Sequence, residues 1–255
     1  MNSQNAQSAD AFPVFSQQAL LDPDSASNAQ VLTASDSHRS AGGTIRKRLT
    51  TPESITPDIL MLCYGLDPTT RPGYVEIRPA PGARINRRFH NAQERVRTRG
   101  GTIQYGWRVW EWPGILLQAD FHAVWAHPIG KYIDVTPCEY GEPRILFHPD
   151  SVRQCYDDPP PSVTMSLIDS PTLKQYLDVS EQIAEIKRNG QRDLMTNTVL
   201  VNRADTEPLL RKQHELEEEL VRDQDDLRAA HRKVAPRDQC PCGSGRTHRD
   251  CCAAG

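Results

Sequence analysis

The chain has 255 residues, of which 37% are hydrophobic and 25% charged, with a formal net charge of −3. This hydrophobic content is below the usual globular range, so we do not expect a single core that spans the full length. No apolar run approaches the roughly 18 residues of a membrane-spanning helix, so we expect a soluble protein, and the small net charge favours no class of partner.

The first part of the chain has the composition of a disordered tail. Residues 1–48 are rich in Ser, Ala, Gln, Asn and Asp and show no sustained hydrophobic periodicity. The first ten residues are polar and do not resemble a signal peptide. We therefore expect a cytoplasmic protein, in a reducing compartment where its cysteines stay free of disulfides.

A compact α+β core is expected over residues 49–156. Thr56 is a typical N-cap for a short helix over residues 57–64, whose first position is a proline. Apolar residues at helical spacing predict a second helix before the glycine pair Gly100–Gly101. The stripe of that helix consists of Ile85, Phe89, Ala92 and Val96. The predicted strands of a small antiparallel sheet, against which this helix packs, are residues 71–80, 102–112, 115–125, 131–135 and 144–147.

A linker and helical region is expected over residues 157–237. The segment Asp157–Pro161 is proline-rich and marks the linker. Ser170 is a typical N-cap for a helix over residues 171–189. A long charged helix follows over residues 207–234, with a heptad-like but interrupted apolar seam. The seam fits either a helix that packs on its own core or a coiled-coil dimer, and the sequence leaves both open.

The C-terminal residues 238–255 hold four cysteines within a very short segment. Four thiols that close so small a loop are the ligand set of one structural zinc ion, which supplies folding energy that burial cannot. His248 lies between the two cysteine pairs and is a competing ligand for the fourth position. The predicted ligands are Cys240, Cys242, Cys251 and Cys252.

This spacing resembles a known family module, the SEC-C motif, whose pattern is C-x-C-x-S-G-x-x-[YF]-K-x-C-[CH]. His248 stands at the aromatic position of the pattern and Arg249 at the lysine position. The resemblance implies a packing role for His248 and zinc ligation by Cys252. It also implies that the module docks onto a protein partner and carries no chemistry of its own. The matching residues are Cys240, Cys242, Ser244, Gly245, Cys251 and Cys252.

A histidine and an aspartate interrupt two predicted strands of the core. His122 and Asp134 have equal parity, so a hairpin with a three- or five-residue loop puts both side chains on one face of the sheet, opposite each other. A carboxylate beside an imidazole fixes its tautomer and raises its basicity, as in a Cys-His-Asp catalytic site. A buried structural pair without a catalytic role is the other interpretation.

Residues 89–149 resemble a group of uncharacterised bacterial and phage-borne proteins that often carry SEC-C modules. The resemblance lies in the runs GG-x3-YGW-x-VWEWP, FHAVW, DVTP and ILFHPD. It implies a core similar to transglutaminase-like and papain-like cysteine hydrolases, with the nucleophilic cysteine at a helix start. In that group the helix begins Cys-Phe-x-Asn, whereas this chain has Arg88 before Phe89. A guanidinium stays protonated and cannot attack a carbonyl, so the expected nucleophile is missing.

Three functions follow from these features. The first is a non-catalytic interaction or adaptor protein, with a degenerate hydrolase-like core and a zinc module that contacts a protein partner. The second is a cysteine-type hydrolase or acyl transferase that uses Cys63, His122 and Asp134. The third is binding of nucleic acid through the Arg84–Arg99 helix. The missing helix-start cysteine favours the first, and so we do not expect an enzyme.

Overall fold

The computed structural model describes residues 29–33, 49–138, 140–153, 159–193, 198–231, 234–241 and 245–252. The predictions for Cys242, and for residues 1–48 other than 29–33, lie outside these residues. Residues Ala29–Thr33 form strand β1, so the prediction of a tail without structure is wrong for this segment. No helix within the described ranges is long and apolar enough to cross a membrane.

The core is a six-stranded sheet in which five strands close on themselves. The strand order is β3-β6-β2-β5-β4-β7, and β3 also pairs with β4, so the first five strands form a ring. The predicted sheet was antiparallel, but β2 and β5 are parallel, and β7 was not predicted. The strands are β2 (Gly73–Ile77), β3 (Thr102–Trp112), β4 (Leu116–Ala126), β5 (Tyr132–Asp134), β6 (Arg144–Pro149) and β7 (Val163–Ser166).

Strand alternation divides the side chains of the ring between two sides. On β4, Phe121 and Ala123 pack toward the helices, whereas Val124 packs inside the ring. The interior contains an apolar cluster, and β3 lies close to β6 at Gly106, where a Cβ would lie 2.3 Å from the carbonyl oxygen of His148. The buried interior cluster consists of Val75, Val124, Ile145 and Phe147.

Two helices cover the outer side of the ring. Helix α2 (Pro57–Leu66) begins as predicted, because the Thr56 hydroxyl accepts a hydrogen bond from the Ile59 N–H at 3.3 Å. Helix α3 (Arg88–Arg99) ends at Gly100, whose φ of 68° is unfavourable for other residues. Phe89, Ala92 and Val96 of the predicted stripe contact the sheet, but Ile85 precedes the helix and is exposed.

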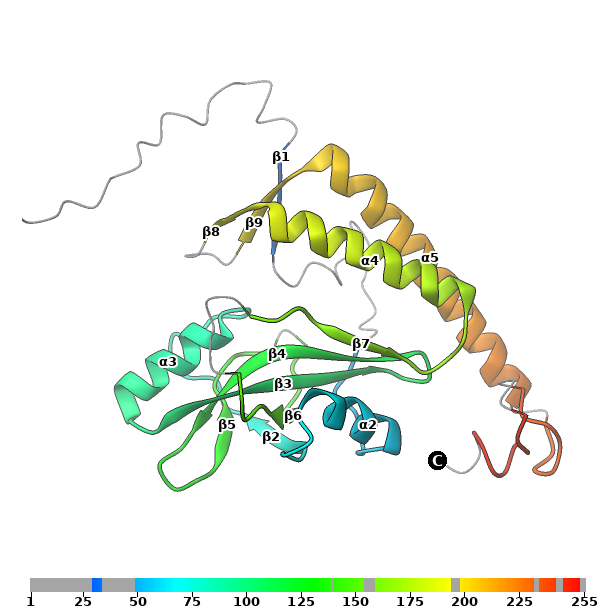
Figure 1. The fold of residues 1–255 in the computed structure, drawn as a ribbon, viewed down its shortest axis with the longest axis horizontal. Helices are drawn as coiled ribbons and strands as arrows, with labels where there is room; N and C mark the ends of the chain where they lie inside the picture. The colour runs from blue at the N-terminus through cyan, green and yellow to red at the C-terminus, as the bar shows by residue number, and fades with distance from the viewer. Residues whose placement is uncertain are drawn as a thin grey trace, which may run out of the picture.

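A helical hairpin packs against the far end of the β3–β4 hairpin (Figure 1). Helix α4 (Pro171–Asn189) begins after Ser170, as predicted, and helix α5 (Arg203–His231) lies beside it. The prediction started α5 four residues too late, because the Asn202 side chain caps the Ala204 N–H at 3.0 Å. Trp112, Leu116, Leu173, Ile183, Leu216 and Leu220 share one buried cluster.

The seam of α5 therefore packs on the core of its own chain over residues 209–221. Leu216 and Leu220 are 2% and 0% exposed in this contact. Beside the hairpin, β1 pairs with β9 (Thr198–Asn202), which pairs with β8 (Gln191–Asp193), in a three-stranded antiparallel sheet. The sequence did not predict this second sheet, because its strands are very short and one lies in the segment that was predicted to be disordered.

Candidate functional sites

The predicted His122–Asp134 pair forms inside the strand ring. The His122 Nε2 atom lies 3.0 Å from Asp134 Oδ2, and both side chains are at most 5% exposed. The five-residue loop 127–131 joins β4 to β5, in the register Trp125↔Ile133. This register places Asp134 diagonal to His122 and not directly opposite it. The prediction of a shared face and a contact is confirmed, and only the cross-strand position differs.

Burial sets the protonation of this pair. It lowers the pKa of His122, against the opposing effect of the Asp134 carboxylate. Burial alone would raise the pKa of Asp134, but His122, the Thr136 N–H and the Arg108 charge more than offset it and lower that pKa. The pair at neutral pH is therefore a neutral imidazole whose Nε2–H donates to a carboxylate.

Cys63 lies on the other side of the sheet from this pair. Its side chain packs with Trp107, Phe121 and the rest of α2, on the helix-covered side. His122 lies on the inner side, where its ring is 6.5 Å from that of Phe147. Burial raises the pKa of Cys63 to about 12, so it remains a thiol at neutral pH.

Arg88 lies at the start of α3, where the resemblance places the nucleophile. Its guanidinium is 5.0 Å from the centre of the Phe89 ring. Its charge is near enough to His122 to lower the pKa of that imidazole. A second cation whose charge lowers the pKa of His122 is Arg108, which forms an ion pair of 3.1 Å with Glu142 and was not singled out from the sequence. The pair thus has cations near it rather than a thiolate.

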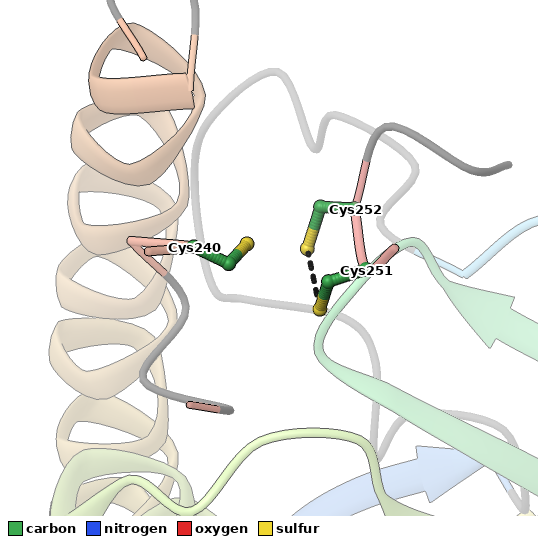
Figure 2. A group of neighbouring side chains, drawn as sticks. All are labelled: Cys240, Cys251 and Cys252. Atoms are coloured by element: carbon green, nitrogen blue, oxygen red, sulfur yellow. Dashed lines mark hydrogen bonds between the residues drawn. The ribbon is translucent and has the colours of Figure 1, made fainter. Parts of the chain in front are cut away.

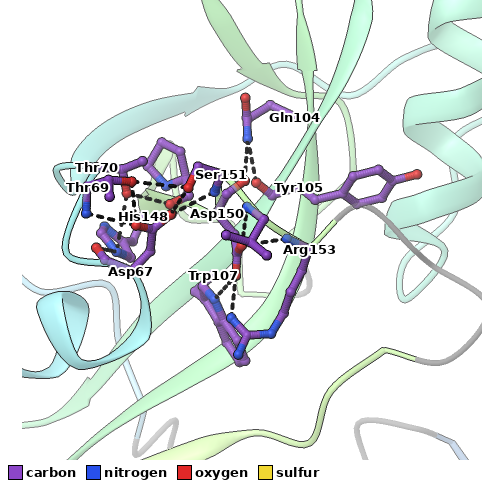
Figure 3. Close-up of polar contacts among 12 residues, drawn as sticks. Asp67, Thr69, Thr70, Gln104, Tyr105, Trp107, His148, Asp150, Ser151 and Arg153 are labelled. Atoms are coloured by element: carbon purple, nitrogen blue, oxygen red, sulfur yellow. Dashed lines mark hydrogen bonds and ion pairs between the residues drawn. The ribbon is translucent and has the colours of Figure 1, made fainter.

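A second buried polar network joins the end of α2 to the end of β6 (Figure 3). Asp67 accepts hydrogen bonds from Thr69 and from Ser151, which lower its pKa. Asp150 accepts from Trp107 Nε1 at 3.0 Å and forms an ion pair with Arg153 at 2.8 Å. Every oxygen of the two carboxylates is bonded inside the protein. The network is thus a structural connection, which the sequence did not indicate.

The Arg84–Arg99 segment is surface-exposed along much of its length. Arg97 pairs with Glu94 at 2.9 Å, and Arg95 lies over the Trp125 ring at 4.7 Å. Arg84, Arg87 and Arg99 have no ion-pair partner among the described residues, and they surround the start and end of the helix without forming one line. The structure gives this segment a positive charge but no aromatic platform for bases.

The C-terminal module folds back on itself through backbone contacts. Gln239 and Thr247 form an antiparallel bridge, and the Cys240 N–H donates to the Arg246 carbonyl oxygen at 2.8 Å. Gly245 makes the intervening turn with a φ of +73°, a conformation that L side chains rarely adopt. These contacts bring the first cysteine of the module next to the last two.

Three thiols of the module converge on one point (Figure 2). The Sγ atoms of Cys240, Cys251 and Cys252 all lie within 4.8 Å of one another, and those of Cys251 and Cys252 are 3.8 Å apart. Tetrahedral zinc with Zn–S bonds of about 2.3 Å requires sulfur atoms about 3.8 Å apart. The donor set and its spacing therefore fit a zinc ion.

Comparison with protein families supports this geometry. Residues 237–254 match the family model described as the SEC-C motif. The C-terminal module is a SEC-C motif. The match covers only this end of the chain, and comparison with curated proteins and with solved structures finds no significant match.

Three of the four predicted ligand positions of the SEC-C module lie in one thiol cluster that could hold a metal ion. Cys252 belongs to the thiol cluster, whereas His248 is not among its members, in agreement with the predicted preference. Cys242 lies outside the described residues. The Arg246 guanidinium contacts Cys251 Sγ at 3.5 Å, a hydrogen bond that suits a metal-bound thiolate. Sequence reasoning did not single out Arg246.

Proposed function

We propose that this chain is a zinc-dependent interaction protein without catalytic activity in its core. The SEC-C module would hold one zinc ion through Cys240, Cys242, Cys251 and Cys252, and would dock onto a protein partner. The observation that supports the zinc site is the convergence of three thiols at zinc-compatible spacing. Bound zinc would fix the loop of the module, so that its surface side chains are presented in one arrangement.

The position of Cys63 supports the absence of cysteine catalysis. A nucleophilic thiol must lie within hydrogen-bonding reach of its base, about 3 Å. Cys63 packs on the helix-covered side of the sheet and His122 inside the ring, and the raised pKa of Cys63 leaves almost no thiolate at pH 7. The His122–Asp134 pair is then a buried hydrogen bond that positions β5 against β4.

Thiol alkylation of the full-length, zinc-loaded protein tests both parts of this proposal. We expect Cys63 to resist iodoacetamide until the protein unfolds, and the cysteines of the SEC-C module to resist it until a chelator removes zinc. Cys138, which is half-buried and outside both groups, is the internal control for reagent access. Labelling is measured by peptide mass spectrometry. Rapid labelling of Cys63 in the native protein, suppressed by His122→Ala, would show a catalytic thiol instead.

The docking role needs a partner that depends on the folded module. We expect proteins that co-purify with the wild type to be lost with Cys240→Ser/Cys251→Ser, and a purified candidate to bind that variant at least about tenfold more weakly. Cys63→Ala is the matched control, since it removes a thiol outside the module. Equal binding by the wild type and the Cys240→Ser/Cys251→Ser variant, for every purified candidate, would contradict docking through the module.

A further inference from the structure

An open cavity of about 700 Å³ lies at the β2 side of the ring, and Val75 and Phe147 of the interior cluster form part of its lining. It is bounded by β2, the end of β6 and the turn between β4 and β5. It exists because β5 pairs with β2 only at Glu76 and Ile77, so the beginning of β2 has no ladder partner on that side. Cavities that bind small molecules have volumes of about 300–1,000 Å³, and this one is within that range.

Aromatic rings line part of the cavity. Tyr74 and Tyr132 are both half-buried in its lining but on opposite faces of the sheet: Tyr74 packs on the α2 side, and Tyr132 packs on the ring interior, where its ring is 6.3 Å from that of Phe147. The hydroxyl groups of both tyrosines are bonded to the protein, to Pro52 and Gln104, which fixes the rings in place. Rings held in this way offer planar surfaces against which another ring can stack.

The cavity also carries an excess of positive charge. Three cations line it, Arg71, Lys131 and Arg144, against the single carboxylate of Glu76, which gives a net charge of 3 − 1 = +2. Glu76 is bonded more closely to Arg78, at 2.7 Å, than to Lys131, at 3.6 Å. The Lys131–Glu76 pair is more than 40% exposed on both sides and is therefore weak. Lys131 is thus available to a ligand anion.

The remaining two cations are placed at the two ends of this wall. Arg71 is exposed and has no hydrogen-bond or ion-pair partner among the residues that the structure describes. The Arg144 guanidinium lies over the Tyr74 ring, 3.8 Å from its centre, and covers that face with a planar cation on which another ring can stack. Gly73 lies between them in β2, and no atom comes within 4 Å of a Cβ built there.

We propose that this cavity binds a nucleoside phosphate. The base stacks on the Arg144 guanidinium that lies over the Tyr74 ring, and the phosphate is held by Arg71 and Lys131. An apolar ligand would leave the two charges without a counter-ion, and a cationic ligand would be repelled by the net charge of the lining. An inorganic anion would leave the aromatic wall unused. The ligand that uses both features carries a planar ring and a phosphate.

Calorimetric titration of the zinc-loaded, full-length protein with AMP tests this proposal. Adenosine and inorganic phosphate serve as half-ligands, and a short single-stranded oligothymidine distinguishes a free nucleotide from a nucleic acid strand. We expect AMP to bind at least about tenfold more tightly than either half-ligand, because only AMP uses the rings and the charges together.

Two variants, each with a matched control, locate the binding. Arg71→Gln/Lys131→Gln should weaken AMP binding by at least about tenfold, since two charge-assisted contacts are lost. Arg97→Gln/Lys174→Gln makes the same change in net charge at exposed ion pairs of α3 and α4, and should stay within about twofold of the wild type. Gly73→Tyr should fill the cavity and abolish binding, whereas Gly65→Tyr, another glycine with open space around it, should not.

Three kinds of result would overturn the proposal. The first is the absence of saturable AMP binding up to about 5 mM. The second is adenosine binding as tight as that of AMP, or AMP binding that Arg71→Gln/Lys131→Gln leaves unchanged. The third is binding of the oligothymidine without AMP, which would assign the surface to nucleic acid. The charge variant alters exposed side chains only, so it remains informative even if Gly73→Tyr fails to fold.

Discussion

His122 and Asp134, which lie inside the strand ring, depend on each other for their hydrogen bonds. Asp134 has two acceptor oxygens and two buried donors to satisfy. One oxygen accepts from His122 and the other from the Thr136 N–H at 2.9 Å. His122 and the Thr136 N–H are therefore both satisfied within the protein, but only while Asp134 offers two acceptor oxygens.

Asp134→Asn should therefore destabilise the protein. An amide supplies one oxygen where two are needed, so either one of the two donors loses its acceptor or the His122 proton must move from Nε2 to Nδ1, for which the described residues offer no acceptor. We expect the free energy of unfolding to fall by about 2 kcal/mol, the cost of one buried unsatisfied donor. Urea unfolding followed by tryptophan fluorescence measures it. Asp169→Asn, at an exposed ion pair, is the control and should have no measurable effect. Equal stability of the Asp134 variant and the wild type would contradict this interpretation.

The buried histidines predict a loss of stability in mild acid. Burial lowers the pKa of both His122 and His148 in the folded protein, whereas an unfolded histidine titrates near about 6.5. Below that pH the unfolded chain binds protons that the folded chain does not, so the free energy of unfolding decreases as the pH decreases. The slope is at most about 1.4 kcal/mol per pH unit for each histidine.

Unfolding curves between pH 7.5 and pH 5 test this expectation. Most carboxylates contribute little in this window, because their unfolded pKa values lie near about 4; Glu111, whose pKa burial raises in the folded protein, acts in the opposite direction to the histidines. His122→Gln/His148→Gln should flatten the slope. If that variant does not fold, titration of the wild-type imidazoles by NMR answers the same question. Stability that stays constant or rises as the pH falls to 5 would show that the buried histidines are protonated in the folded state.

At the scale of elements, the ring depends on the close approach of β3 to β6. Gly106 is paired with Pro149 on β6 and with His122 on β4. A Cβ at this position would lie 2.3 Å from the His148 carbonyl oxygen and 2.6 Å from Phe147 Cζ. Backbone on one side and a buried ring on the other leave no room to relax. The strand pairing that closes the ring therefore needs a residue without a side chain here.

Gly106→Ala should reduce the stability by about 3 kcal/mol, through this overlap in a packed core. Gly73→Ala on the neighbouring strand β2 is the matched control, since its Cβ meets open space. Because Gly and Ala differ in chain entropy in the same way at both positions, the difference between the variants isolates the overlap. Thermal unfolding by circular dichroism measures it. Similar stabilities of the two variants would mean that β3 and β6 are farther apart in solution.

Some elements could be predicted from the sequence because their signals are local. Thr56 and Ser170 are N-caps next to prolines, and Gly100 stops α3 through its positive φ, so the start or end of each helix depends on neighbouring residues. The long strands β3 and β4 carry enough aromatic and β-branched residues to be recognised. The start of α5 was misplaced by four residues, because the cap Asn202 was not recognised.

At the scale of the whole molecule, the SEC-C module and the strand ring have separate sources of stability. Cys240 is buried, but it belongs to none of the apolar clusters of the described core. The ring and the helical hairpin are held by apolar burial, in part between Trp112 and Tyr176, whose rings are 6.0 Å apart. We therefore expect bound zinc to stabilise the module alone.

Removal of zinc by a chelator should unfold the module and leave the core intact. We expect the wild type to release about one zinc ion per chain, with no shift in tryptophan emission, because all four tryptophans lie in residues 107–125. Metal analysis and near-ultraviolet circular dichroism measure the two effects. His248→Ala should retain zinc, and Cys251→Ser should lose it. A core that melts together with the module would contradict this independence.

The sequence by itself determined the SEC-C module, the helix caps and the two long strands, because these depend on the identity and spacing of residues close together in the chain. It also predicted the contact between His122 and Asp134, since strand parity and a short loop suffice for it. Only the tertiary structure decided that the strands close into a ring, that Cys63 and His122 lie on opposite sides of the sheet, and that a cationic, aromatic cavity opens beside β2. These features arise from pairing between distant segments, where packing in three dimensions selects the register and the neighbours.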